Sequence, residues 1–156
     1  MEGKNDRSVN WYVATIRAGQ WRKIGQKLSD LGIEYYIPDV FKTLLFLHTD
    51  KDKALSLVNS RTFWARFLID HITHTLLVVP AKQMDDFRRV LDLSPDAECM
   101  TSSPLVKGAR VRVVKGALDG VEGEIVEAPE GQYLIVRVLS LLCAKVEMPK
   151  SHVIVI

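Results

Sequence analysis

The stretch that decides the fold is residues 106–128, VKGARVRVVKGALDGVEGEIVEA. Its four glycines stand between alternating apolar residues, at Gly108, Gly116, Gly120 and Gly123. Glycine tolerates positive φ and allows two backbones to approach closely, as a tight loop between strongly curved strands requires. Residues 106–128 are therefore predicted to form two curved strands joined by a tight loop.

The rest of the C-terminal region has the same character. Short β-rich runs follow at residues 133–139, 144–149 and 152–156, separated by glycine, proline or acidic residues. No apolar spacing typical of a helix is sustained over about ten residues here. Consecutive short strands predict a small all-β barrel at residues 105–156, because closing a sheet on itself removes exposed strand edges.

A change of composition precedes this barrel. Residues 93–104 contain two prolines, several serines, two acidic residues and few large apolar side chains. Such a stretch buries little surface, which is typical of a linker. The sequence thus predicts a first domain at 1–92, a linker at 93–104 and the barrel at 105–156.

The first 92 residues alternate between strand and helix patterns. Residues 10–17, NWYVATIR, are rich in aromatic and β-branched side chains, which predicts a strand. From Trp21 the apolar residues recur every three or four positions, which predicts an amphipathic helix ended by Gly32. The remaining patterns predict strands at 33–38, 42–49 and 63–70, a helix capped by Asp50, and a closing helix at 84–91.

This order of elements predicts the fold class. Strand, helix, two strands, helix, strand and a closing helix are typical of an antiparallel sheet with helices on one face. The whole chain is therefore expected to be an α+β protein that ends in a small all-β barrel.

The composition limits the class of protein. Apolar residues make up 47% and charged residues 26%, and the net charge is +2, too weak a bias by itself to indicate wrapping by nucleic acid. Residues 1–10 lack the apolar segment of a signal peptide, and no run approaches the roughly 20 apolar residues of a membrane span. We expect a cytoplasmic, monomeric protein whose two cysteines, Cys99 and Cys143, are reduced.

The sequence contains no motif that indicates catalysis. A phosphate-binding loop, a nucleophile elbow and an HExxH zinc motif are all missing. His71 and His74 have i, i+3 spacing but no plausible further metal ligands, and Asp85 with Asp86 is interpreted as a solvated pair on a helix exterior. A protein that is not an enzyme, and that holds no metal or cofactor, is predicted.

The glycine pattern of residues 106–128 resembles the KOW motif. A glycine precedes a strand with alternating valines, then G-x-x-x-G-x-x-G leads into a second strand that contains valine. The motif occurs in NusG-family factors and in some ribosomal proteins. The resemblance therefore leaves two kinds of partner open at this point.

The N-terminal part resembles the NGN domain that precedes KOW in NusG-like proteins. The similar segments are WYV at residues 11–13, FWARFLID at 63–70 and LLVVPAKQMDDFRRVL at 76–91. The last segment is most similar to the UpxY branch, which are antiterminators of capsular polysaccharide operons in Bacteroides-type bacteria. One departure is the hairpin after Pro38, where a basic flexible loop is usual in the family and Lys42 is the only base. Functions of that loop are not carried over.

The resemblance implies that the NGN domain binds RNA polymerase, at the clamp region, through exposed apolar residues. An interface centred on aromatic side chains is physically reasonable, because such residues bury a large area at small entropic cost. An ordinary core role stays open for each candidate. The candidates are Tyr12, Ile16, Phe41, Phe46, Phe63, Trp64 and Phe67.

A basic surface is the second feature implied by the resemblance. Arg17, Arg22, Lys23 and Lys27 cluster at the first helix and are candidates for binding the non-template DNA strand, although a solvated helix face has the same spacing. The barrel is expected to contact a ribosomal protein, a termination factor or nascent RNA. The chain is thus predicted to be a transcription elongation and antitermination factor, with a ribosome-associated or RNA-binding KOW module as the alternative.

Overall fold

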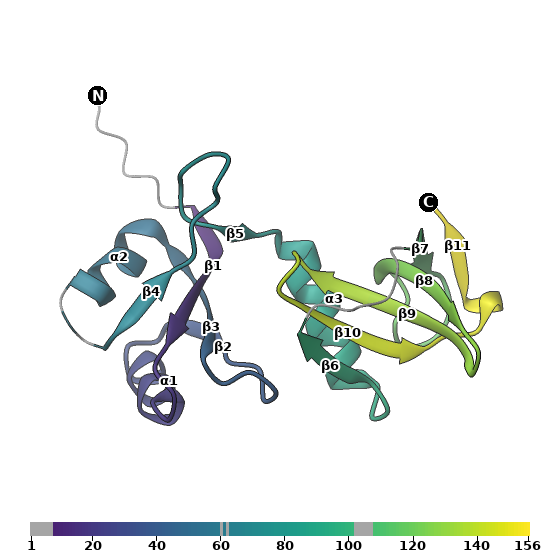
Figure 1. Cartoon of the computed structure of the whole chain (residues 1–156), viewed down its shortest axis with the longest axis horizontal. Helices are drawn as coiled ribbons and strands as arrows, with labels where there is room; N and C mark the ends of the chain where they lie inside the picture. Colours follow the sequence, from purple (N-terminus) through teal and green to yellow (C-terminus); the bar gives the residue numbers. More distant parts are fainter. Residues whose placement is uncertain (1–7, 60, 62, 102–107) are drawn as a thin grey trace. The chain divides into compact units, whose positions relative to one another are not determined.

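The computed structural model describes residues 8–59, 61, 63–101 and 108–156, which form two compact units (Figure 1). The first unit comprises residues 1–80 and the second comprises residues 81–156. We describe each unit by itself.

The first unit is built on an antiparallel sheet with β1 (Val9–Ile16) at its centre. One edge of β1 pairs with β3 (Leu44–Asp50), which in turn pairs with β2 (Glu34–Tyr36). The other edge pairs with two short strands, β4 (Ala65–Phe67) and β5 (Val78–Val79). The predicted antiparallel sheet is confirmed.

Two helices, α1 (Trp21–Asp30) and α2 (Lys51–Asn59), pack on one face of this sheet (Figure 1). The face is formed by alternate residues of β1 and β3, because successive side chains of a strand point to opposite sides. This arrangement confirms the predicted layer of helices on one side of the sheet. The buried residues of the cluster are Tyr12, Ala14, Ile16, Ile24, Leu28, Leu45, Leu47, Ala54, Leu57 and Ala65.

The ends of these helices follow the local sequence signals. Gly32 has φ +69° just after α1, and its N–H donates to the carbonyl of Ser29, which terminates the helix. At the start of α2, the Asp50 carboxylate accepts a hydrogen bond of 2.8 Å from the backbone N–H of Lys53. Both predicted helix boundaries are confirmed.

The second unit contains a strongly paired antiparallel sheet, as predicted for a small all-β domain. The strand order is β11-β7-β8-β9-β10-β6, in which β6 is Glu98–Thr101, and every pairing is antiparallel. A short 3-10 helix, η1 (Lys150–His152), leads into the last strand. The region predicted to be a barrel, called the barrel below, contains β7 (Ala109–Val113), β8 (Glu122–Ala128), β9 (Gly131–Val138), β10 (Leu142–Glu147) and β11 (Val153–Val155), and among the described residues its strand pairings form an open sheet.

The four glycines of the motif divide into two physical roles. Gly116 and Gly120 have φ of +82° and +92°, in the turn between β7 and β8. At Gly123 an added Cβ would lie 2.5 Å from the carbonyl oxygen of Ile135, and Gly108 is crowded in the same way by the carbonyl of Ile125. The predicted combination of positive φ and close backbone approach is therefore confirmed.

The division between the units differs from the predicted one. Helix α3 (Ala81–Leu93), expected to close the first domain, belongs to the second unit, where it packs on β9 and β10. Part of the predicted linker forms β6 (Glu98–Thr101), which pairs with β10, whereas residues 102–104 lie outside the described residues. Polar composition suggested a linker here, but a short edge strand needs few apolar residues because it obtains its hydrogen bonds from its neighbour.

Asp86 explains part of the attachment of α3 to the barrel. The sequence analysis predicted a solvated side chain for Asp86, and this prediction is wrong, because the residue is only 2% exposed. The carboxylate accepts a hydrogen bond of 3.1 Å from the backbone N–H of Glu122 and lies 2.9 Å from the Lys82 ammonium. Three further hydrogen bonds join α3 to the strands and turns. The N–H of Leu139 donates to Gln83 Oε1, and Lys82 Nζ donates to the carbonyl of Gly120. Arg89 donates to the carbonyl of Ala117.

Replacement of Asp86 by alanine is expected to lower the free energy of unfolding of the second unit by about 1–3 kcal/mol, because the N–H of Glu122 loses its buried acceptor. Asp85→Ala is the matched control, since Asp85 is the exposed neighbour on the same helix. Urea unfolding followed by amide signals of the barrel measures both. Tryptophan fluorescence reports the first unit separately, because all three tryptophans lie within residues 1–80. Equal losses in the two variants would contradict a specific role for Asp86.

Candidate nucleic-acid interface

The first unit contains a pocket of about 340 Å³ beside the N-terminal half of α1. One wall is the helix, whose Lys23 and Lys27 lie on one face because they are four residues apart. The opposite wall consists of Phe63 and Trp64, which immediately precede β4. The full lining is Arg17, Gln20, Lys23, Ile24, Lys27, Phe63 and Trp64.

An arginine and an exposed tryptophan meet at this pocket. The guanidinium carbon of Arg17 lies 5.1 Å from the centre of the Trp64 ring, within the range of a cation–π contact. Trp64 is nevertheless 48% exposed, so much of its indole ring stays open to solvent. An open aromatic surface beside a fixed cation is a suitable platform for a nucleobase and its phosphate.

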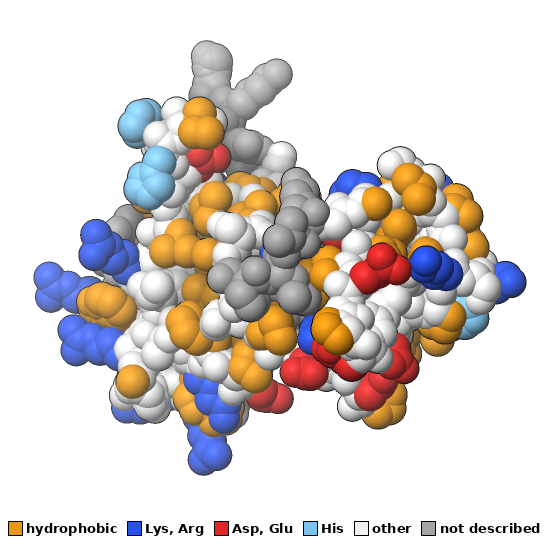
Figure 2. Space-filling model, turned by 45° about the vertical axis from the view of Figure 1, so that its right-hand side comes forward, with side chains coloured by type: hydrophobic (Ala, Val, Ile, Leu, Met, Phe, Trp, Pro, Cys, Tyr) orange, Lys and Arg blue, Asp and Glu red, His pale blue; other side chains and the backbone are white. Residues whose placement is uncertain are grey.

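The electrostatics of the pocket favour an anion. Its lining contains three basic side chains and no acidic one. Helix α1 adds to this bias, because its first turn has no acidic residue and Gln20 makes no capping hydrogen bond with its side chain. Residues 1–80 carry 11 basic and 8 acidic residues, whereas residues 81–156 carry 10 and 11. Lys and Arg side chains gather at the edge of the first unit in Figure 2, and acidic side chains gather on the second.

The structure brings together three of the four residues predicted to bind DNA. Arg17, Lys23 and Lys27 line the pocket. Arg22 does not, because its guanidinium lies over the ring of Trp21, 4.9 Å from the ring centre, on another side of α1. Trp21, which we expected on the apolar stripe of the helix, is partly buried against the core and also carries the ammonium of Lys42 at 4.3 Å.

Phe63 and Trp64, which were predicted to bind polymerase, line the wall of the basic pocket. Strand pairing explains this position. Ile16, the last residue of β1, pairs with Ala65, the first residue of β4, so Arg17 just after β1 lies close to Trp64 just before β4. The sequence predicted both strands, but it did not predict the register in which they pair.

The predicted polymerase-binding residues do not form one open patch. Tyr12 and Ile16 belong to the core between the sheet and its helices, at 4% and 3% exposure, and Phe46 is fully buried. These three residues were expected to be exposed, and they are buried because β1 and β3, which pair over most of their length, form the centre of the sheet. Phe67 is partly buried and packs edge-on against Tyr12. Phe41, in the connection between β2 and β3, is exposed.

The described part of the chain contains neither a cluster of metal ligands nor a helix that could span a membrane. His71 and His74 are both exposed, and no group of three or more His, Cys, Asp or Glu side chains in the described residues is arranged to hold a metal ion. Within the same residues, no helix combines the length and the apolar character that crossing a membrane requires.

The elements and their order define a class of protein, in which a helix-covered antiparallel sheet is followed by a small β domain. Thermotoga maritima NusG, in a structure concerned with the interaction of its domains, has this architecture. The two chains are 19% identical and superpose with a TM-score of 0.52 over 96% of this chain and 98% of that one. The chain therefore has a NusG-like fold. No protein-family model and no curated protein matches the sequence.

Proposed function

We propose that the protein is a transcription elongation factor of the NusG type that binds RNA polymerase and single-stranded nucleic acid through its first unit. The pocket of Arg17, Lys23, Lys27 and Trp64 carries this proposal, because it combines phosphate-binding cations with an open aromatic ring on a NusG-like sheet. The non-template DNA strand is the proposed ligand. The protein would act in the cytoplasm as an adaptor rather than as an enzyme.

The proposed contact with polymerase lies in the connection between β2 and β3. Val40 and Phe41 are consecutive and are 54% and 41% exposed. Two large apolar side chains on a tight connection can supply the anchor of an interface, because such anchors carry most of the binding energy. The family resemblance in the sequence supports the proposal that the first unit binds polymerase at the clamp. It also supports the proposal that the barrel binds a ribosomal protein, a termination factor or nascent RNA. The same resemblance supports an antiterminating role like that of the UpxY branch.

The alternative is a ribosome-associated or RNA-binding module that works through the barrel. The charge of the second unit favours the polymerase hypothesis, because a groove of the β domain is lined by three glutamates, Glu127, Glu130 and Glu147, and by one lysine, Lys150. Burial, and then the carboxylates of Glu130, Glu147 and Glu98, raise the pKa of the neighbouring Tyr133. A negative potential at this groove opposes binding of an RNA backbone.

Capture of polymerase tests the proposal. We expect the purified chain to retain RNA polymerase from a bacterial lysate after nuclease treatment, and a Val40→Ser, Phe41→Ser double variant to bind it at least about tenfold more weakly, as expected for loss of an interface anchor. Ile154→Ser is the matched control, because Ile154 is an exposed apolar residue of the second unit at 47%. Capture of ribosomal RNA instead, lost on nuclease treatment, would support the alternative.

A further inference from the structure

A second groove, of about 600 Å³, flanks α1 on the side away from the pocket. Helix residues form one wall and the strand β2 with its following residue forms the other. The lining contains three partly buried aromatic residues and no acidic residue. It consists of Trp21, Arg22, Gly25, Gln26, Ser29, Tyr35, Tyr36 and Ile37.

Gly25 allows the Tyr35 side chain, which lines this groove, to pack closely against α1. A Cβ at this position would lie 2.6 Å from the hydroxyl oxygen of Tyr35, so any larger residue would push the tyrosine ring out of its place. The ring of Tyr35 thus rests directly against the backbone of α1. Glycine in a helix costs about 1 kcal/mol relative to alanine, and here the space that it leaves is filled by an aromatic side chain.

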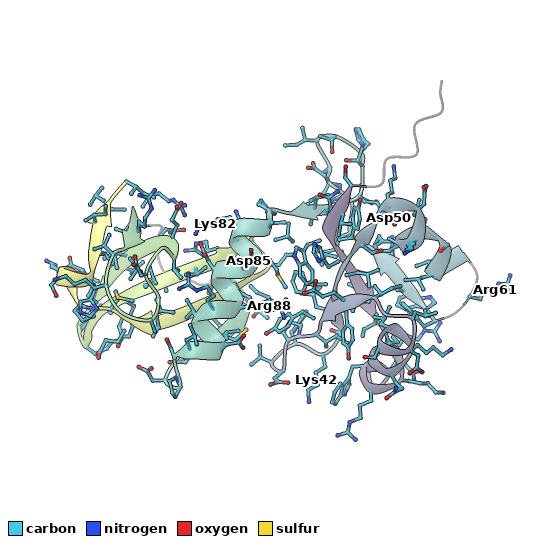
Figure 3. The ribbon with its side chains drawn as sticks, turned by 180° about the vertical axis from the view of Figure 1, so that it is seen from behind. Lys42, Asp50, Arg61, Lys82, Asp85 and Arg88 are labelled. Carbon is cyan, nitrogen blue, oxygen red and sulfur yellow. The ribbon has the colours of Figure 1, made fainter. Side chains whose placement is uncertain are left out.

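Two cations contact the indole ring of Trp21, which lines this groove; Arg22 also lines the groove, whereas Lys42 reaches the ring from outside the lining. The ring of Trp21 carries the guanidinium of Arg22, with 4.9 Å between guanidinium carbon and ring centre, and the ammonium of Lys42 at 4.3 Å. Cations held on an aromatic surface lose less conformational freedom on binding a phosphate than free side chains do. Figure 3 shows Lys42 on the connection that follows β2, next to α1. Aromatic rings with positioned cations favour nucleic acid over an apolar peptide.

The groove and the pocket use opposite sides of α1. Residues 20, 23, 24 and 27 line the pocket, and residues 21, 22, 25, 26 and 29 line the groove. At about 100° per residue these two sets point in opposite directions around the helix axis. Arg22 and Lys23 are consecutive, so a cation stands on each side of the exposed first turn. A helix is about 10–12 Å wide with its side chains, a distance that a short single strand can cross.

We propose that this groove is a second base-binding site, and that one single-stranded nucleic acid crosses the first turn of α1 from the pocket into it. The inference rests on the proposed nucleic-acid function of the first unit and extends its binding site. Bases would pack against Tyr35, and the phosphates between the two sites would be held by Arg22, Lys23 and Lys42.

Oligonucleotide length separates the two sites. Fluorescence anisotropy of labelled thymidine oligomers of about 4 and about 12 nucleotides, and of uridine oligomers of the longer size, spans the usual range of site sizes. The short oligomer should need only the pocket. We expect Tyr35→Leu to weaken binding of the longer oligomer about tenfold, as for loss of one stacked base, and to leave the short one unchanged.

Two further variants distinguish a loss of binding from a loss of folding. Gly25→Ala displaces the Tyr35 ring without altering a charge, and Arg22→Gln should lower the salt dependence by about one phosphate contact. Lys53→Gln, on the other helix, is the control for Arg22→Gln. Thermal unfolding by circular dichroism verifies each fold.

The possible outcomes separate the two proposals. If the wild-type chain binds neither oligomer, the proposed nucleic-acid function fails. If it binds both and folded groove variants bind the longer oligomer as tightly as wild type, the second site is wrong while the pocket stands. A preference for thymidine or uridine oligomers tells DNA from RNA as the strand that is bound.

Discussion

Replacing Arg17, Lys23 and Lys27 together by glutamine is expected to lower the affinity for single-stranded DNA about 100-fold at about 0.1 M salt. Each phosphate contact to a single strand contributes a slope of about 0.7 in the dependence of log affinity on log salt. Three contacts therefore account for about two decades of affinity at this salt concentration, and for a slope lower by about 2. Fluorescence anisotropy across a salt series measures both quantities.

A second triple variant is the matched control. Lys51→Gln, Lys53→Gln and Arg61→Gln remove the same charge from exposed positions of the same unit. Arg61 lies after α2 and projects away from the body of the unit in Figure 3. We expect this control to change the affinity less than about threefold, because it affects only the screened long-range field. Equal losses in the two triple variants would show that net charge, not the pocket, binds the strand.

Arg137→Met is expected to lower the free energy of unfolding of the second unit by about 3 kcal/mol. The Glu124 carboxylate is 3% exposed and lies 2.8 Å from Arg137 Nε, and it also accepts the N–H of Gly108 at 3.2 Å. Removing the arginine leaves a buried negative charge without its main partner, which costs more than a lost surface pair. The Arg137 side chain is 23% exposed, so we take the low end of the usual range.

Urea unfolding followed by barrel amide signals measures this loss. Arg110→Met is the matched control, because Arg110 lies 3.7 Å from Glu122 with a side chain that is 52% exposed. Such a pair contributes less than about 1 kcal/mol. A double variant, Arg137→Met with Glu124→Leu, should recover part of the loss by removing the buried charge. If Arg137→Met behaves like the control, the pair is not a structural element of the barrel.

Local signals predicted the elements of this chain well. The end of α1 at Gly32 and the cap of α2 at Asp50 depend on residues within one turn of the helix end. The turn glycines of the barrel are similar, because positive φ is a property of a single residue. The alternation of apolar residues in 106–128 predicted strands because it is also a local pattern, set by neighbouring residues.

The composition of the candidate site was only partly predictable. The basic residues of α1 were identified from their spacing along one helix. The tryptophan that completes the pocket comes from a distant segment, and its position depends on the register between β1 and β4. A shift of one residue in that register would turn Trp64 to the other side of the sheet. The spacing of apolar and polar residues predicts which face of a helix or strand is buried. It does not predict which other segment packs beside that face.

By itself, the sequence determined the α+β class, the small β domain and the basic face of α1, because each is encoded by residues close together in the chain. The tertiary structure decided where α3 and β6 belong, and which side chains surround the pocket. Asp86 shows the physical reason, since its partner N–H belongs to Glu122, 36 residues further along the chain. An amphipathic pattern predicts that such a helix packs on something, and only the packed structure supplies the backbone groups that select its place.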